Sequence, residues 1–351
     1  MQDIADRCGV SKVTVSRAFR GERRFVSRET VDRVLSVARE LGYDPSYHQA
    51  ARRLALRKVG KDVLNMVIAF CFPADLYLYN YFGLLFKGMM DAAIAQGYSL
   101  LSVVDLRLKQ PPIPAVFARG DVDGIISLMH ANDFTKALEH LRSELSFQDR
   151  PAVSLMEPAK GCSSVLADEF EGGYSSAAHL LDLGHRHMLH FIVRTGIWPH
   201  AERLRGYRQA FTDRNLDPDG HLASAEWYTE TQPWPGLPGP ERIVLPALRE
   251  HPEITAILAR NDVMATKIKH SLSRAGIRVP ENISLVGYDD TDPIVDDRGD
   301  NVLTTVSVSL GDVGRAAAQL LIGRIEGEES EDRTIVLPTE LMVRRSTGPP
   351  R

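Results

Sequence analysis

The chain has 351 residues, of which 44% are hydrophobic and 25% charged, a length and composition typical of a globular protein with two or three domains. It holds no run of 18 apolar residues, so we expect no membrane-spanning helix and no membrane partner. The opening MQDIADRCGV lacks the features of a secretory signal, and Cys8, Cys71 and Cys162 are too far apart to indicate a disulfide or a zinc site. We therefore expect a cytoplasmic protein with reduced, buried thiols.

The net charge of −4 is distributed unevenly along the chain. Residues 1–60 carry 13 Lys and Arg against 7 Asp and Glu, whereas residues 61–351 carry 29 against 39. A basic segment attached to an acidic body is typical of a nucleic-acid-binding module fused to a domain with another task. A solvated basic helix would give the same charge, so charge alone leaves both interpretations open.

Residues 2–41 are predicted to form three short helices. Gly9 ends the first, because glycine accepts the left-handed backbone of a tight turn, and Ser11 is the N-cap candidate of the second. Helical spacing divides the second helix into an inner face with Val15, Ala18 and Phe19 and an outer face with Lys12, Val13, Ser16, Arg17 and Arg20. Ser27 is expected to cap the third helix, whose buried stripe comprises Val31, Val34, Leu35, Ala38 and Leu41.

Two helices joined by a short turn, the second presenting hydroxyls and cations, are typical of a helix-turn-helix unit. We predict that Lys12 and Val13 meet base edges, as a donor to guanine and an apolar contact for a thymine methyl. Arg17, one turn later, would bridge a guanine or a phosphate. Thr14, Ser16 and the helix N-terminus at Ser11 would fix the DNA backbone. A purely structural three-helix bundle would have the same spacing.

The run DIADRCGVSKVTVSRAFRGERRFVSRETVDRVLSVARELGYDP resembles the N-terminal signature of the lactose-repressor (LacI/GalR) family. It follows the order and spacing of that family's AGVS, TVSR, VS..T...V and LGY.P elements. The resemblance implies a lambda-repressor-like helix-turn-helix domain, here over residues 1–44, in which the positions of Lys12, Val13 and Arg17 read operator bases. It makes the bundle interpretation the weaker one.

The basic stretch SYHQAARRLALRK, within residues 45–60, resembles the hinge helix of that family. In the family this helix forms on DNA when two subunits pair, and a leucine is inserted into the minor groove. Leu54 is our candidate for that leucine. It lies nine residues after Pro45, whereas the family pattern has about seven, so the hinge is expected to carry a two-residue insertion.

From residue 61 onward, apolar runs such as LNMVIAF, VDGIISL, ITAILA and ISLVGY alternate with helical stretches. This alternation predicts an α/β fold with parallel sheets covered by helices on both faces. The family resemblance extends to about residue 347 and implies a periplasmic-binding-protein-like core over residues 61–351, with two doubly wound parallel-sheet subdomains and three crossings. We expect the N-subdomain at about 61–162 plus 292–322 and the C-subdomain at about 163–291 plus 323–347.

Candidate ligand-contacting residues follow several of these strands. Asp289 follows ISLVGY, Asn261 follows ITAILA, and the segment after HMLHFIV carries Trp198 and Arg203, a set that suits a polyol because these groups pair with hydroxyls and an indole face packs on C–H groups. The resemblance implies effector contacts for Arg203, Asn261 and Asp289, and it pairs Tyr81 and Phe82 with the family's aromatic cleft edge. Alternatively, Asp289 is a turn acid, Asn261 a helix cap, and the three aromatic residues packing residues.

The sequence gives little support to a metal site or to enzymatic activity. His179, His185, His187 and His190 lie partly on a predicted strand, where alternate side chains point to opposite faces, so a shared metal is not expected. No G-x-S-x-G, H-E-x-x-H or P-loop sequence occurs, and we expect neither a cofactor nor enzymatic activity. The sequence thus predicts a homodimeric regulator that binds a palindromic double-stranded operator and a small effector, such as a sugar. A sugar-binding transport component is the alternative.

Overall fold

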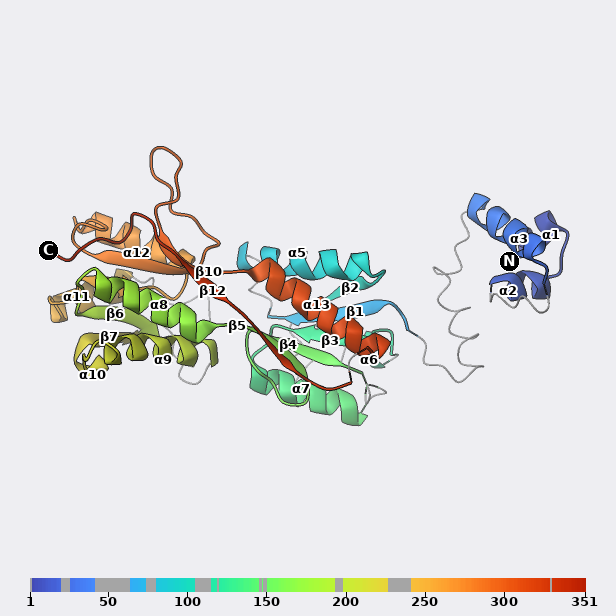
Figure 1. Cartoon of the computed structure of the whole chain (residues 1–351), viewed down its shortest axis with the longest axis horizontal. Coiled ribbons are helices and arrows are strands. Elements are labelled where there is room, and N and C mark those ends of the chain that lie inside the picture. The colour runs from blue at the N-terminus through green and yellow to red at the C-terminus, as the bar shows by residue number, and fades with distance from the viewer. Residues whose placement is uncertain are drawn as a thin grey trace. The chain divides into compact units, whose positions relative to one another are not determined.

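The structure is a computed structural model that describes residues 2–19, 26–41, 64–73, 80–104, 115–118, 120–144, 147, 150–192, 198–226, 241–328 and 330–351. The chain divides into two compact units, Met1–Asn65 and Met66–Arg351 (Figure 1). In the described part of the chain, no helix is both long and apolar enough to cross a membrane.

The described residues of the first unit form three helices: α1 (Gln2–Cys8), α2 (Lys12–Phe19) and α3 (Arg28–Glu40). Gly9 has a φ of 62°, the left-handed conformation expected at the end of α1. The Ser27 side chain accepts a hydrogen bond from the Thr30 amide and caps α3, as predicted. Val34 and Ala38 are buried, but Leu41 is 37% exposed, because α3 ends at Glu40 and leaves Leu41 outside the buried stripe.

The second unit contains two six-stranded sheets, each the centre of one lobe. The first sheet has the strand order β11-β5-β4-β3-β1-β2 and is parallel throughout. The strands of the first lobe are β1 (Val67–Phe72), β2 (Ser99–Val104), β3 (Gly124–Ser127), β4 (Ala152–Leu155), β5 (Ser163–Ala167) and β11 (Thr334–Leu337). Its helices are α5 (Asn80–Ala95), α6 (Ala115–Ala118), α7 (Ala131–Glu144) and α13 (Leu310–Glu326).

The second sheet has the order β12-β10-β9-β8-β6-β7, in which only the β10–β12 pair is antiparallel. The strands of the second lobe are β6 (Met188–Ile192), β7 (Leu222–Glu226), β8 (Ala256–Leu258), β9 (Ser284–Asp289), β10 (Thr304–Val308) and β12 (Thr339–Met342). Its helices are α8 (Glu169–Asp182), α9 (Trp198–Thr212), α10 (Pro218–His221), α11 (Glu241–Glu250) and α12 (Asp262–Arg274).

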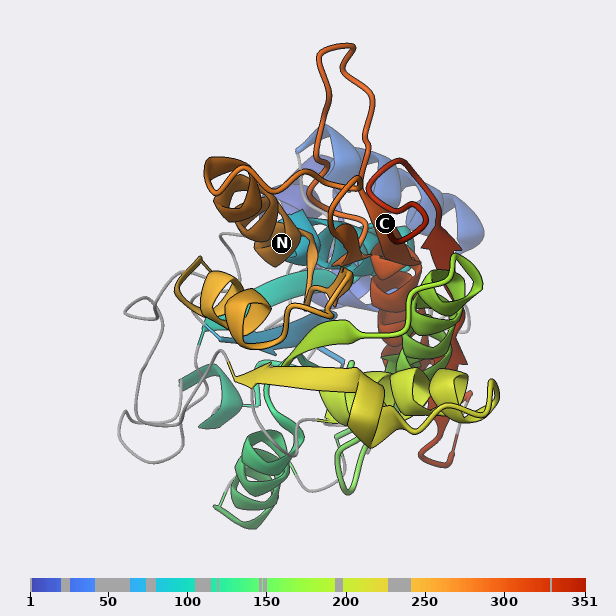
Figure 2. The ribbon, with the colours of Figure 1, turned by 90° about the vertical axis from the view of Figure 1, so that its left-hand side faces the viewer.

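Each sheet has helices on both faces, so the side chains on both sides of its apolar strands are covered. In the first lobe α5 and α13 pack on one face, while α6 and α7 pack on the other. In the second lobe α8 and α9 lie opposite α11 and α12, as Figure 2 shows from the end of that lobe. The predicted fold class, a helix-turn-helix unit followed in the chain by two doubly wound sheets, is therefore the observed one.

The crossings between the lobes lie at other positions than the sequence suggested. β5 (Ser163–Ala167) and β11 (Thr334–Leu337) pair with each other in the first sheet, and β10 (Thr304–Val308) pairs with β9 in the second. The chain thus crosses at residues 168, 309 and 338. The expected limits near 162 and 322 differ because β5 and β11 pair across about 170 residues, which the local apolar pattern does not reveal. The limit near 292 differs because β10 joins the second sheet beside β9 before the chain crosses.

Candidate DNA-binding and effector sites

Helix α2 presents Lys12 and Val13, at the start of the predicted outer face, to solvent. The Ser11 side chain accepts a hydrogen bond of 3.1 Å from the Thr14 amide, which caps the helix at its first turn. Val13 is 56% exposed although it is apolar, whereas Val15 is fully buried against α1 and α3. An exposed valine beside an exposed Lys12 at the start of a capped helix is a surface suited to base edges in a major groove.

Not all of the predicted DNA contacts can be located. Ser16 and Arg17 are half-buried on α2, next to the exposed start of the helix. Arg20, Leu54 and the hinge segment around Leu54 lie outside the described residues. The minor-groove role of Leu54 and the hinge insertion stay predictions.

In the second lobe, three candidate effector residues follow strands that are neighbours in the sheet. Arg203 lies on α9 after β6, Asn261 precedes α12 after β8, and Asp289 ends β9. The sheet order runs β9-β8-β6-β7. After β7 is added on one side of β6, the following strands β8 and β9 are added on the other side, so the strand order reverses between β6 and β8. In open parallel sheets, ligands bind beyond the strand C-termini at such a switch point.

Arg203 is buried and already engaged by the protein. Its Nε donates to Glu169 Oε2 at 2.5 Å, and its Nη1 donates to the Arg260 carbonyl at 2.8 Å. The guanidinium carbon lies 3.4 Å from the centre of the Tyr288 ring. These contacts hold the guanidinium in one orientation, and leave its remaining N–H groups as those that a ligand could engage.

Asp289 combines burial with an unusual backbone. Its φ is 94°, a left-handed value that costs free energy in a residue with a Cβ. Burial raises the pKa of its carboxyl to about 7, against the opposing charge of Arg203. Asn261 caps α12, its Oδ1 accepting from the Met264 amide at 2.9 Å, so the helix-cap role is present and its NH₂ group is what could face an effector.

Tyr81 and Phe82, the aromatic pair at the start of α5, have different surroundings. Phe82 packs into the first lobe, with ring centres 4.6 Å from Phe72 and 5.6 Å from Phe86, which favours the core interpretation. The pKa of Tyr81 lies well above its ordinary value because of burial and the charges of Asp289 and Glu169. Tyr81 directly follows Asn80, whose side chain donates a hydrogen bond to the Thr291 carbonyl of the second lobe.

Glu157 connects the N-termini of two helices in different lobes. Its Oε2 accepts from the Ala131 amide, at the start of α7, at 2.8 Å. Burial alone would raise the pKa of Glu157, but hydrogen bonds from His130 and from the backbones of Ala131 and Trp198 keep it below its ordinary value. The backbone of Trp198, at the start of α9, is thus held near the first lobe, and its half-buried side chain fits either ligand contact or packing.

Comparisons with known proteins match different families to the two units of the chain. Residues 1–46 match the family model described as bacterial regulatory proteins, lacI family. Residues 177–347 match the model described as a periplasmic binding protein-like domain. The chain belongs to the LacI family of regulators. It is a DNA-binding transcriptional regulator with an effector-binding core.

Similar proteins extend over the length of this LacI-family regulator. The HTH-type transcriptional regulator DegA of Bacillus subtilis is 29% identical, over 99% of this chain and 97% of the relative. A LacI-family regulator from Enterococcus faecium, solved with bound ribose, is 25% identical with a TM-score of 0.66, covering 81% of this chain and 100% of that structure. The lac repressor dimer bound to operator and the anti-inducer ONPF, 23% identical, shares the fold with a TM-score of 0.70 over 99% and 98% of the two chains.

The structure of the LacI-family regulator adds residues that sequence reasoning missed. Glu169, Glu157 and His200 were not singled out, although Glu169 is fully buried against Arg203. Burial, followed by the charges of Arg203, Arg260 and His130, holds the pKa of His200 well below its ordinary value. No local signal separates Glu169 from Asp168 and Glu171, the two other acids between the end of β5 and the glycine pair of α8.

Proposed function

We propose that this LacI-family regulator is a repressor, whose first unit binds a palindromic operator as a dimer and whose second unit binds a sugar effector between its lobes. The observation that carries the proposal is the joint occurrence of an exposed, capped recognition helix and a buried Arg203–Glu169–Asp289 group at strand C-termini. The first suits DNA and the second suits a small polar ligand.

The operator contacts follow from the accessibility of α2. Lys12 and Val13 are the base-reading candidates at its start, and Arg17 is the candidate one turn later. Ser11, Thr14 and Ser16 would fix the DNA backbone, together with the helix N-terminus. Two such units in a homodimer would read two half-sites of a palindrome.

The effector is proposed to be a sugar because of the chemistry of the candidate residues. A carboxylate at Asp289, the remaining guanidinium N–H groups of Arg203 and the amide NH₂ of Asn261 offer paired hydrogen bonds to hydroxyls. Tyr81 and Trp198 would supply aromatic surface from the two lobes, whereas Phe82 packs in the core beside Tyr81 in the chain. The ribose bound by the Enterococcus faecium relative supports this ligand class.

A gel-shift assay tests the operator half of the proposal. The full chain is titrated against DNA fragments from its own gene neighbourhood at moderate salt, with non-specific competitor DNA. We expect a sequence-specific complex with at least one fragment. A protein that shows none, but whose melting temperature rises with a sugar, would be the transport component instead.

A thermal-shift screen tests the effector half. A ligand that binds only the native state raises the melting temperature, by a stabilisation of about 2.7 kcal/mol at 100 times its Kd. We expect at least one mono- or disaccharide to raise it, and Asp289→Ala to abolish that shift. A shift that persists in Asp289→Ala would remove Asp289 from the site.

A further inference from the structure

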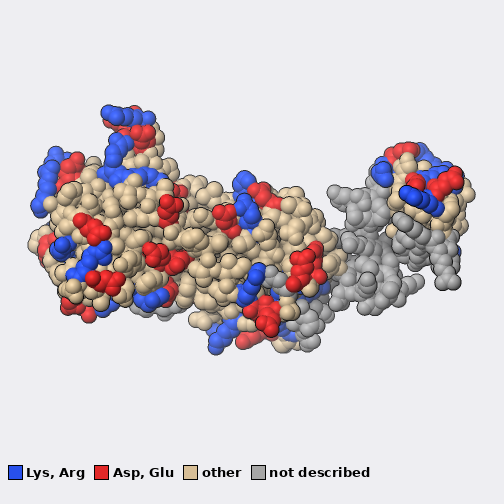
Figure 3. Space-filling view, in the orientation of Figure 1, with Lys and Arg blue, Asp and Glu red and all other residues tan. Residues whose placement is uncertain are grey.

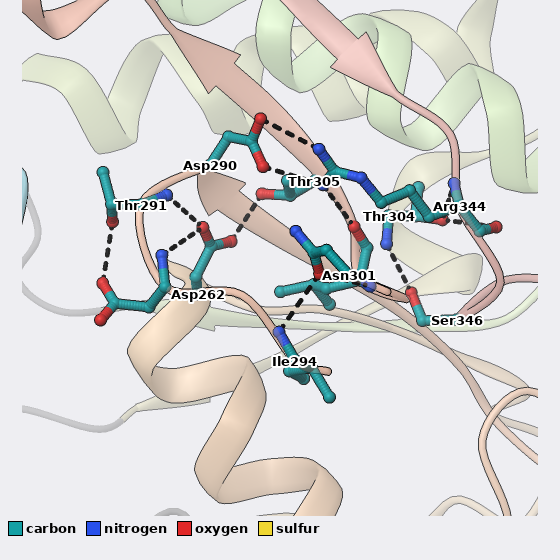
Figure 4. A network of polar contacts seen from close by, with 11 residues as sticks. Asp262, Asp290, Thr291, Ile294, Asn301, Thr304, Thr305, Arg344 and Ser346 are labelled. Carbon is teal, nitrogen blue, oxygen red and sulfur yellow. Dashed lines mark hydrogen bonds and ion pairs between the residues drawn. The ribbon is translucent and has the colours of Figure 1, made fainter. Parts of the chain in front are cut away.

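A buried carboxylate outside the predicted effector set organises the turn after β9. Asp262, the first residue of α12, is 1% exposed. One of its oxygens accepts from the Thr305 hydroxyl at 2.6 Å, and the other accepts from the backbone amides of Thr291 and Asp292 at 2.8 and 3.4 Å (Figure 4). Asp262 therefore joins α12 and β10 to the turn that follows Asp289.

The turn at residues 289–292 has a backbone that needs such support. Asp289 and Asp290 have φ values of 94° and 53°, both left-handed in non-glycine residues. Such conformations persist only where surrounding contacts fix them. Arg344 holds the side chain of Asp290 through two N–H···O contacts of 2.8 and 3.1 Å, and Asp262 holds the amides of the next two residues.

Gly287 of strand β9 leaves room for the Asp262 carboxylate. A Cβ on Gly287, in the middle of β9, would lie 2.2 Å from Asp262 Oδ1. A side chain at residue 287 would thus displace the carboxylate from the turn. The glycine lets strand β9 and the carboxylate approach one another beneath the proposed effector site.

The same turn also reaches the other lobe. Asn80, the first residue of α5, donates from its side-chain amide to the Thr291 carbonyl at 3.3 Å and to Asp292 Oδ1 at 3.1 Å. One end of the turn thus carries Asp289, and the other end contacts the first lobe one residue before Tyr81.

We propose that Asp262 is a positioning residue, which fixes the turn 289–292 so that Asp289 faces the effector while Thr291 and Asp292 hold Asn80 of the first lobe. The proposal deepens the proposed function and rests on it for the effector, but the turn and the lobe contact can be tested without any ligand. In this arrangement a ligand that moves Asp289 also moves the contact with α5, which links effector binding to the arrangement of the lobes.

The first readout is hydrogen exchange of the peptide that carries Thr291 and Asp292, measured on the full chain without DNA or sugar. Asp262→Ala removes the acceptor of both amides, and we expect their exchange to become about tenfold faster, the factor that corresponds to one lost hydrogen bond. Exchange in strands β8 and β9 should change little, which separates loss of the turn from unfolding of the lobe.

The second readout is the side-chain NH₂ resonance of Asn80 in asparagine-selective ¹⁵N spectra, assigned by its loss in Asn80→Ala. We expect Asp262→Ala to shift this signal towards the position of a solvated amide. Asp262→Asn should restore both readouts, because its carbonyl can accept from the turn amides while its NH₂ donates to the Thr305 hydroxyl oxygen.

Asp296→Ala is the matched control, since Asp296 also accepts from two backbone amides, those of Arg298 and Asp300, but in the next loop. It should change neither readout. If Asp262→Ala does not fold, Thr305→Val removes only the partner of Asp262 and should change both readouts in the same direction.

Unchanged exchange and an unchanged Asn80 signal in the folded variant would overturn the proposal, as would an Asp262→Asn chain as disturbed as Asp262→Ala. Failure to find an operator or a sugar would instead count against the proposed function alone.

Discussion

At the scale of single residues, the core of the second unit buries charged groups whose orientation would matter for binding a ligand. A buried ion pair such as Arg203–Glu169 contributes little net stability, because desolvating both charges offsets their attraction. Its effect is geometric, since Arg203 is fixed between Glu169, the Arg260 carbonyl and the Tyr288 ring. We read this as preorganisation for a ligand rather than as a device for stability.

Asp289 gives a prediction about pH. Its folded pKa of about 7 lies above the ordinary value near 3.8, so between these values the native state binds more protons than the unfolded state. Stability therefore falls as the pH rises through that range. Asp289→Asn removes this dependence, and in the absence of sugar its melting temperature should exceed that of the wild type at pH 8 and approach it at pH 5. A difference that does not vary with pH would contradict the raised pKa.

Arg17 gives a prediction about operator recognition. Arg17→Ala is expected to cost about 1 to 3 kcal/mol of discrimination between operator and altered sites, because a base-reading Arg contributes to specificity. Arg39→Ala, which removes an exposed cation from α3 of the same unit, is the control and should retain the preference. Competition gel shifts with single-base operator variants measure both, and an Arg17→Ala chain with wild-type preference would assign Arg17 to the DNA backbone.

At the scale of elements, each lobe contains a helix pair that approaches through glycine. A Cβ on Gly88 of α5 would lie 1.9 Å from the Gly311 carbonyl oxygen of α13, and one on Gly173 of α8 would lie 2.3 Å from the Arg203 carbonyl oxygen of α9. Glycine is needed there because two backbones touch. In the second lobe this packing also places the backbone of Arg203.

The glycines of α5 offer a matched pair of variants. Gly88→Ala should destabilise the second unit by about 1 to 3 kcal/mol, since the helices must move apart. Gly83→Ala, in the same helix, meets no atom within 4 Å and should stabilise by about 0.5 to 1 kcal/mol through the lower entropy of the unfolded chain. Urea unfolding of both variants measures the difference, and equal midpoints would show that α5 and α13 do not pack as described.

Elements were predictable from the sequence where they depend on neighbours in the chain. The inner face of α2 and the Ser27 cap follow from helical spacing, and both are observed, together with the exposed Lys12 and Val13 of the outer face. The crossings were misplaced because β5 is completed by β11, about 170 residues later. The supports of the candidate site, Glu169 and Asp262, were missed because nothing in the local pattern distinguishes a buried acid from an exposed one. The roles of Arg203, Asn261 and Asp289 came from family resemblance and stay predictions.

At the scale of the whole molecule, the two units differ in charge, as their proposed tasks require. Residues 1–60 hold 13 Lys and Arg against 7 Asp and Glu. On the face drawn in Figure 3, basic and acidic side chains of the second unit are interspersed, with wide uncharged areas between them. DNA binding should therefore depend on ionic strength and sugar binding should not.

This difference gives a prediction that separates the two functions in one protein. If a dimer neutralises about 6 to 10 phosphates, raising the salt from about 50 to 200 mM lowers operator affinity about 10³- to 10⁵-fold through counterion release. The melting-temperature shift caused by a bound sugar should hardly change over the same range, because contacts to neutral hydroxyls release no counterions. Gel shifts and thermal shifts on one preparation supply both measurements. Operator affinity that is insensitive to salt would mean that Lys12, Arg17 and their neighbours do not lie on the DNA backbone or its bases, even though Lys12 is exposed at the start of α2.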